Sequence, residues 1–373
     1  MNLVCLWTTI KYTLSMKGFL LLVLISALLL TGFLFVRSRS SSMNGGGLTG
    51  ILEILRRTKT PTDSALPRAG KGGASPFGVM LAGKSVDVAS QLGVSYYRPS
   101  SIFIDKWNGN CTECDLVVAQ DLKLILTVRN NGGAGQPTSP PADLEAYKRT
   151  LKSVLDKYKP EILAVENEEN SQTLFYSGSP SQYHQELKAA CEVAHSKGIK
   201  CTNGGLVSSL VALLVANNYI EKGDNSKAED FIKLTLRDDQ YDKFQKAGGF
   251  SSKAIIDQIE TGKEFVSGYK NAGADYINFH WYIADTTALG EAVDYLEAAS
   301  GLNALTNEVG QQRNEDPNQV TSVMQKIVDL KLPYAVWFSM DVPGFGGARS
   351  LLNPDGTLRP NGEAFRDFID KNF

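Results

Sequence analysis

From Ser75 to the C-terminus, short apolar runs alternate with amphipathic stretches of helical period. Each apolar run ends in polar or glycine residues, as expected of a strand that leads through a loop into a helix. Eight candidate strands can be placed: PFGVMLAG from Pro76, VSYYRP from Val94, LKLILTVRN from Leu122, EILAVENE from Glu161, IKCTNGG from Ile199, DYINFHWY from Asp275, NALTNEVG from Asn303 and PYAVWFSM from Pro333. We expect helices between them at Pro141 to Tyr158, Ser181 to Lys197, Ala288 to Ala299 and Pro317 to Leu330, and a last helix from Asn361 to Lys371.

Strands that alternate with helices predict a parallel α/β fold. No glycine-rich nucleotide-binding fingerprint follows the first strand, which argues against an open doubly wound sheet. We therefore predict a closed (β/α)8 TIM barrel over residues 75–373. The interval between the fifth and sixth strands is longer than most others, and it predicts a helical insertion of three helices at about 207–271. The insertion could form a wall of a cleft or an enlarged outer helical layer.

The N-terminal part has a different composition. The run from Gly18 to Val36, within residues 1–36, carries no charge and is just long enough to cross a bilayer as a helix. We predict a transmembrane anchor here, with a cleaved signal peptide as the alternative. Residues 37–74 are rich in Ser, Gly and Pro, which predicts a flexible linker. The barrel would then lie outside the cytoplasm, membrane-anchored or, if the leader is cleaved, secreted.

Charge and cysteine content narrow the possible partners. Up to Lys71 there are nine Lys or Arg and two acids, whereas the remainder has 29 bases and 38 acids. An acidic body is a poor partner for phosphate backbones, so we expect no nucleic acid. Beyond Cys5 there are four cysteines, which would suit two disulfides in an oxidising compartment, although free thiols remain the alternative: Cys111, Cys114, Cys191 and Cys201. The chain has three His residues and no recognisable metal-ligand set, so we expect neither a metal nor a cofactor.

In a parallel barrel, functional side chains lie at the carboxyl ends of the strands. The fourth predicted strand ends in VENEEN, which contains Glu168, and the seventh ends in TNEVG, which contains Glu308. Two carboxyl groups at one rim suit glycosidic bond cleavage, since one protonates the leaving oxygen and the other attacks the sugar. Glu169 is the rival for the acid if the strand ends one residue later.

These residues resemble the signature of glycoside hydrolase clan A, retaining (β/α)8-barrel enzymes that include cellulases, mannanases and xylosidases. The resemblance rests on Asn167-Glu168, Glu308 and four further positions at strand ends: Arg98, His280, Tyr282 and Trp337. It implies Glu168 as acid/base, Glu308 as nucleophile, Arg98 and Tyr282 as partners of the nucleophile, Asn167 at the sugar 2-hydroxyl, and Trp337 beneath the reacting sugar. The clan often has Pro after the catalytic Glu, and this chain does not.

The same roles have a physical basis. Arg98 near Glu308 would keep Glu308 ionised, while Glu168, without such a partner, could stay protonated. Sugar rings pack on aromatic faces and their hydroxyls need polar partners, so we add Trp107, Asn130 and Asn203 as substrate-binding candidates. The predicted function is a retaining glycoside hydrolase acting on β-linked oligosaccharides or polysaccharides. A transglycosylase with the same residues and a catalytically silent carbohydrate-binding barrel are the alternatives.

Overall fold

The structure is a computed structural model, and it describes residues 75–373 except 84–85, 133–135, 311–314 and 342–348. The predicted anchor and linker lie outside the described residues, so both remain predictions. In the part of the chain that is described, no helix is long and apolar enough to span a bilayer.

Among the described residues, nine parallel strands form one sheet in the order β2-β1-β9-β8-β7-β6-β5-β4-β3, and a further pairing of β2 with β4 closes it. The strands are β1 (Phe77–Leu81), β2 (Tyr96–Tyr97), β3 (Ile102–Phe103), β4 (Lys123–Arg129), β5 (Ile162–Val165), β6 (Lys200–Asn203), β7 (Tyr276–Trp281), β8 (Asn303–Val309) and β9 (Ala335–Ser339). All eight predicted strands are confirmed. The extra strand, β3, pairs with the carboxyl end of β4, where Phe103 lies opposite Arg129.

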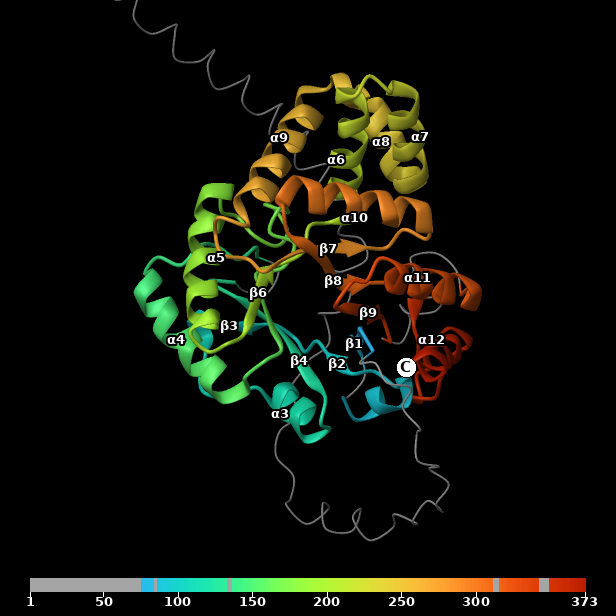
Figure 1. Cartoon of the computed structure of the whole chain (residues 1–373). Helices are drawn as coiled ribbons and strands as arrows, with labels where there is room; N and C mark the ends of the chain where they lie inside the picture. The colour runs from blue at the N-terminus through green and yellow to red at the C-terminus, as the bar shows by residue number, and fades with distance from the viewer. Residues whose placement is uncertain (1–74, 84–85, 133–135, 311–314, 342–348) are drawn as a thin grey trace, which may run out of the picture. The chain divides into compact units, whose positions relative to one another are not determined.

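Helices surround the ring of strands, as Figure 1 shows. Those outside the insertion are α3 (Thr112–Ala119), α4 (Leu144–Tyr158), α5 (Pro180–His195), α10 (Thr286–Ser300), α11 (Pro317–Asp329) and α12 (Pro360–Asn372). The predicted helices are confirmed to within a few residues at each end. Local sequence accounts for several helix starts: Asp143 caps α4, and Ser179 forms a capping box with Gln182 ahead of Pro180 in α5.

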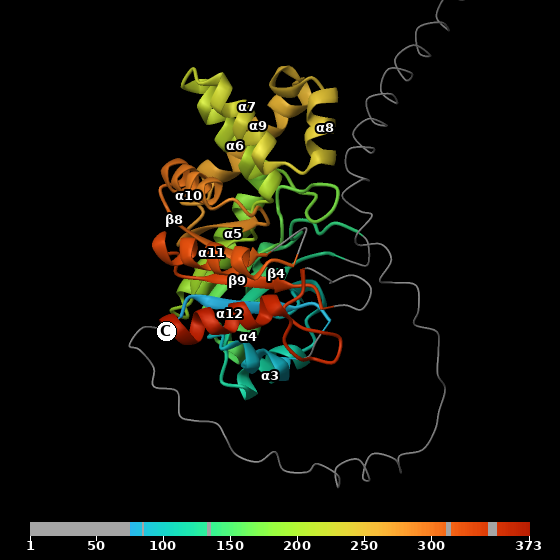
Figure 2. The same cartoon turned by 90° about the vertical axis from the view of Figure 1, so that its right-hand side faces the viewer.

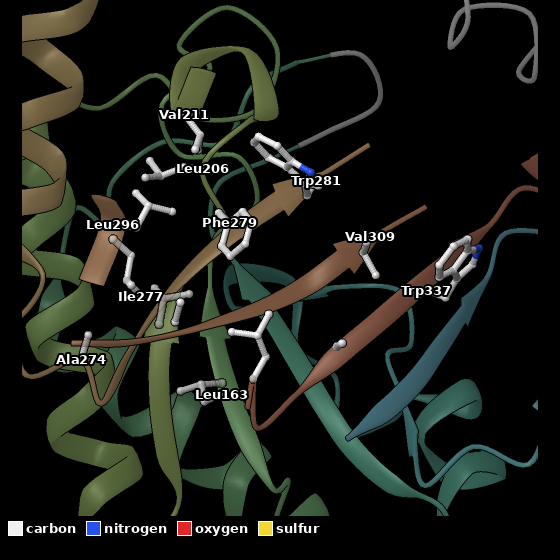
Figure 3. Packing of buried hydrophobic residues seen from close by; sticks show 14 of the residues in the cluster. Leu163, Leu206, Val211, Ala274, Ile277, Phe279, Trp281, Leu296, Val309 and Trp337 are labelled. Carbon is white, nitrogen blue, oxygen red and sulfur yellow. The ribbon is translucent and has the colours of Figure 1, made fainter. Parts of the chain in front are cut away.

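The strands have two apolar faces. A small cluster fills the barrel interior: Tyr96, Ile125, Ile162, Leu305, Tyr334 and Val336. The larger cluster lies between strands and helices, and Figure 3 shows part of it, including Leu163, Ile277, Phe279 and Val309. Ile162 and Leu163 are neighbours in β5 that point to opposite faces, as pleating requires. This alternation decides which side chain at each strand end reaches the rim.

The long interval between β6 and β7 is helical and contains more helices than the three predicted. Within the fully described range 207–271 there are four α-helices, α6 (Ser208–Glu221), α7 (Asn225–Thr235), α8 (Asp238–Lys246) and α9 (Lys253–Gly268). Helix α6 packs against α7, α9 and α10. Figures 1 and 2 show the four helices grouped beyond α10, at one side of the barrel. The insertion therefore extends the outer helical layer.

The four cysteines of the body form two disulfides. Cys111 pairs with Cys114 at the start of α3, and Cys191 of α5 pairs with Cys201 of β6. In each disulfide the two cysteines lie close together in the sequence, 3 and 10 residues apart.

Candidate active site

The carboxyl ends of β5 and β8 bring two glutamates together. Glu168 follows β5, Glu308 lies in β8, and their side chains are 17% and 14% exposed. A carboxylate oxygen of each, together with a ring nitrogen of His280 from β7, lie within 4.8 Å of one another. The two predicted catalytic carboxylates therefore face each other at the rim of the barrel.

The backbone after β5 turns sharply to present Glu168. The amide of Glu166 still donates to the carbonyl of Val128, so the ladder with β4 continues to this residue. Glu166 and Glu168 have φ values of +67° and +47°, in the left-handed region that non-glycine residues seldom occupy. The amide of Ser171 then donates to the carbonyl of Glu168 at 2.8 Å. Two left-handed residues so close together break the strand alternation, and this is why spacing alone could not orient the three glutamates of this segment.

Both carboxylate oxygens of Glu308 are occupied by donors. Arg98 Nη1 lies 2.6 Å from Oε2, and the hydroxyl of Tyr282 donates to Oε1. Burial by itself would raise the pKa of Glu308, but the charges of His280 and Arg98 and the hydrogen bond from Tyr282 outweigh it and lower that pKa. Glu308 is therefore held as an anion.

Arg98 ties three strand ends together from the barrel interior. Its guanidinium is 3% exposed and donates to the Thr127 hydroxyl, the Asn307 carbonyl and Asn167 Oδ1 at 3.1, 3.0 and 2.6 Å, in addition to Glu308. Asn167 accepts this bond with Oδ1, and its amide NH2 group has no hydrogen-bond partner among the described residues.

His280 is fully buried between the two carboxylates. Its Nδ1 lies 2.9 Å from Oε1 of Glu168 and 3.8 Å from Oε2 of Glu308, while Nε2 lies 3.0 Å from Oδ1 of Asn307. Burial alone would lower the pKa of His280, but the negative charges of Glu308 and Glu168 raise it. The imidazole of His280 packs directly against the backbone of Gly205. The φ of Gly205 is +114°, and an added Cβ there would lie 2.3 Å from Nε2 of His280. Sequence analysis missed Gly205, which only the Gly-Gly pair after β6 could have suggested.

The other two glutamates of the segment are buried away from this centre. Glu166 accepts from the backbone N–H of Asn130 at 2.8 Å and from the Thr138 hydroxyl, and Arg129 lies beside it. Glu169 accepts from Tyr269 and Asn203. The structure therefore brings Glu168, and not its rival Glu169, to Glu308.

The two predicted asparagine ligands have structural partners. Asn203 is fully buried, and its amide bonds Glu169 at 2.7 Å and the Asn278 backbone. Asn130 is 4% exposed, and its amide donates to the Ser139 carbonyl. The Asn203 side chain and the Asn130 amide nitrogen are thus engaged within the protein, so we do not include these residues in the proposed binding site.

Trp337 does not lie in the group either. It is 1% exposed and packs edge-on against Phe365 of α12, with ring centroids 5.7 Å apart, on the outer face of β9. Figure 3 shows Trp337 on its strand among the buried residues of this layer. The next residue, Phe338, points the opposite way and contacts Tyr282 edge-on at 6.4 Å. Phe338, one residue beyond the predicted Trp337, is therefore the aromatic of β9 that contacts the side chain of Tyr282.

The remaining tryptophans of the body also lie in packing positions. Trp107 packs edge-on on Tyr158, the last residue of α4. The ring of Trp107 therefore packs against the C-terminal end of α4. Trp281 is fully buried beside Phe279 (Figure 3). Trp107 is partly buried against the core, and its role as a sugar platform stays a prediction.

A metal could be considered at this centre. Among the described residues, Glu168, His280 and Glu308 form a group whose donor atoms are close enough to surround an ion. Arg98 and Tyr282 already occupy the oxygens of Glu308, and the Arg98 guanidinium supplies the positive charge that a cation would bring. The donor set therefore fits proton transfer better than metal binding.

Known proteins resemble this chain in fold but not in sequence. No family model matches the chain, and no curated protein matches it. Among solved structures, it is similar to a glucosidase from Croceicoccus marinus, with 10% identity, a TM-score of 0.54, and coverage of 79% of this chain and 66% of the other. It is also similar to the exo-beta-1,4-mannosidase Op5Man5 from Opitutaceae bacterium strain TAV5, at 14% identity and a TM-score of 0.50, covering 79% of this chain and 59% of that one.

A third similar structure is GH5_18 from Bifidobacterium longum subsp. longum, with 15% identity, a TM-score of 0.50 and coverage of 80% of both chains. The chain spans less than two thirds of the length of the glucosidase and of the mannosidase. At these identities the likeness concerns the fold, and it confirms the parallel (β/α)8 barrel.

Proposed function

We propose that this protein is a retaining glycoside hydrolase that cleaves β-linked glycans, with Glu308 as the nucleophile and Glu168 as the acid/base. The observation that carries the proposal is the approach of their carboxylate oxygens to within 4.8 Å. Retaining glycosidases hold the two carboxyl groups about 5 to 5.5 Å apart, whereas inverting ones need about 6.5 to 9.5 Å to admit a water between them. The barrel neighbours that are a glucosidase and a mannosidase support the same class.

In the first step, the ionised Glu308 attacks the anomeric carbon of the sugar. Arg98 and His280 keep it charged at the start of the reaction. As the bond from the anomeric carbon to Glu308 forms, the bond to the leaving oxygen breaks, and Glu168 donates its proton to that oxygen. The products of this step are a glycosyl-enzyme ester, a free alcohol and an ionised Glu168.

In the second step, Glu168 accepts a proton from a water, whose oxygen attacks the anomeric carbon and displaces Glu308. Two inversions give net retention and restore both carboxyl groups to their initial protonation states. If another sugar hydroxyl replaces the water, the same residues carry out transglycosylation. Product analysis distinguishes the two outcomes.

Three further side chains surround the place where the sugar would bind. Asn167 has a free amide donor, which we assign to the sugar 2-hydroxyl. Tyr282 keeps its proton, because burial and the charge of Glu308 raise its pKa far above the usual range, so it remains a donor to Glu308. Phe338 offers an aromatic face beside Tyr282, which we assign to the apolar face of the sugar.

The test is hydrolysis by the purified protein of a panel of aryl β-glycosides, including glucosides and mannosides, and of β-linked polysaccharides. We expect Glu168→Gln and Glu308→Ala each to lose about 10³-fold or more in turnover, with the fold retained. Azide should partly restore Glu308→Ala and give an inverted glycosyl azide, since the small anion attacks from the vacated side. Wild-type turnover in either variant would refute the assignment of that glutamate.

We also propose that the barrel works outside the cytoplasm, tethered through residues 18–36 and the linker of residues 37–74. The uncharged run supports the anchor, and two disulfides in the body support an oxidising compartment. In cells that express the full chain, the barrel should sediment with membranes and be degraded by protease added outside. A barrel released into the medium would indicate that the leader is cleaved.

A further inference from the structure

Glu168 begins a tight turn whose two central residues are bound to the insertion. The turn runs from Glu168 to Ser171 and is closed by the 2.8 Å hydrogen bond between their backbones. Its central residues are Glu169 and Asn170. Each contacts a different end of the helical insertion of residues 207–271.

Asn170 contacts the first end of the insertion. Its Oδ1 accepts a hydrogen bond of 3.1 Å from the backbone N–H of Val207. Val207 is the N-cap residue of α6, with φ of −63°. The side chain of the turn thus holds a backbone donor where α6 begins.

Glu169 contacts the last end of the insertion. It is fully buried, and its Oε1 accepts from the hydroxyl of Tyr269 at 2.6 Å as well as from Asn203. Tyr269 is the C-cap residue of α9, also fully buried, with its ring edge-on to Tyr183 and His184 of α5. Oε2 of Glu169 has no hydrogen-bond partner among the described residues, and Tyr269 and Asn203 are the side chains that hold this carboxyl at Oε1.

We infer that the insertion positions the catalytic acid, with Tyr269 and Val207 as positioning residues that act on Glu168 through Glu169 and Asn170. The inference rests on the proposed function and adds a role for the insertion to it. A general acid must lie within hydrogen-bond reach of the leaving oxygen, and small displacements of such groups reduce rates strongly. A residue at φ of +47° depends on its surroundings to keep that conformation.

Two variants test the link at its two ends. Tyr269→Phe removes the hydroxyl and keeps the ring that packs against α5. Val207→Pro removes the N–H donor, while the proline ring favours the φ that Val207 already has. The control is Tyr219→Phe, which removes a hydroxyl from α6 on a ring that packs on Phe231, away from the turn.

The first measurement is hydrogen–deuterium exchange of the peptide that contains Ser171, which needs no substrate. We expect exchange at this amide to be about tenfold faster in Tyr269→Phe and in Val207→Pro than in the wild type, and unchanged in Tyr219→Phe. Unchanged exchange in both test variants would overturn the inference.

The second measurement compares leaving groups. Departure of phenol from a phenyl β-glycoside needs a proton from Glu168, so kcat/KM for these substrates depends on the acid. Departure of 2,4-dinitrophenolate does not need the proton, because this leaving group is already stable as an anion. We expect Tyr269→Phe to lose about tenfold on the phenyl substrate and less than about twofold on the dinitrophenyl substrate. Equal losses on both would mean general damage to the site and would refute positioning of the acid.

The two proposals fail in different ways. If the wild type hydrolyses no substrate while exchange at Ser171 still responds to Tyr269→Phe, the proposed function is wrong and the link between insertion and turn stands. If the wild type is active and Glu168→Gln shows the leaving-group dependence while Tyr269→Phe does not, the function stands and the inference about the insertion is wrong.

Discussion

Nδ1 of His280 lies 2.9 Å from Oε1 of Glu168, and the other ring nitrogen faces the side-chain oxygen of Asn307. Nε2 therefore donates to Asn307, and Nδ1 is the ring nitrogen that faces Glu168. Glu308, 3.8 Å from the same Nδ1, is paired instead with Arg98. One carboxylate thus faces an imidazole and the other faces the permanent positive charge of a guanidinium, which separates the surroundings of two otherwise identical side chains.

The ion pair between Arg98 and Glu308 predicts how activity changes at low pH. Glu308 must be ionised to attack, so activity is lost as the pH falls through its lowered pKa. Arg98→Gln removes one cause of that lowering while burial remains, and the acid limb of kcat/KM should move up by about one pH unit, with a loss of about 100-fold at the optimum. The control is Lys123→Gln, which removes an exposed ion pair with Glu161. An unmoved acid limb in Arg98→Gln would contradict this account of Glu308.

Gly205 predicts a steric requirement for His280. Gly205→Ala would place a methyl group 2.3 Å from Nε2 at a φ of +114°, so we expect a loss of about 3 kcal/mol in unfolding free energy and of nearly all activity. Gly198→Ala is the matched control, because φ there is +71° and nothing lies within 4 Å of the added Cβ. It should cost about 1 kcal/mol and leave kcat unchanged. Similar losses in both variants would mean that backbone strain, and not contact with His280, is responsible.

A second pair of carboxyl groups predicts how stability depends on pH. Burial raises the pKa of Glu166 to about 7, and burial followed by the charge of Glu166 raises that of Glu186 well above its usual range. The folded state therefore binds more protons than the unfolded state, and the stabilisation present below pH ~4.5 is lost as the pH rises through about 7.

Glu186→Gln keeps an acceptor for the Tyr176 hydroxyl and removes one of the two ionisable groups. The decline in unfolding free energy between pH 5 and pH 8 should shrink by about 2 kcal/mol relative to the wild type, as measured by urea unfolding. Glu192→Gln, an exposed position in the same helix that pairs with Lys148, should leave the decline as it is. An equal decline in Glu186→Gln and wild type would show that the buried pair does not titrate in this range.

The opposite faces of β9 predict opposite consequences for two neighbouring aromatics. Trp337→Ala leaves a cavity against Phe365, so it should cost about 3 to 5 kcal/mol of unfolding free energy with little effect on KM at a temperature where it is folded. Phe338→Ala should cost less stability and raise KM for aryl glycosides about tenfold, because a sugar loses its apolar contact. The reverse pattern would place Trp337, and not Phe338, against the substrate.

The sequence contained most of what the fold required. Apolar runs that end in polar residues located all eight predicted strands, because the carboxyl end of a barrel strand is where the chain passes from a buried to a solvated environment. For the same reason they placed Arg98, Glu168, His280, Tyr282 and Glu308 at one rim. The insertion could be predicted from the length of its interval, and the disulfides lie within the two close cysteine pairs.

Orientation at each strand end was beyond the sequence. A side chain points into the barrel or toward the helices according to the exact register of the pleat, so a difference of one residue separates Trp337 from Phe338. The left-handed backbone at Glu166 and Glu168 changes the direction of the side chains again. As a result Asn130 is a buried partner of Glu166, and Asn203 is a buried partner of Glu169. Sequence periodicity determines which elements form, because burial acts on each local run. The pairing of Glu308 with Arg98 and the contacts of the Glu168 turn with Val207 and Tyr269 join residues that are far apart in the chain. Only the closed barrel determines these contacts.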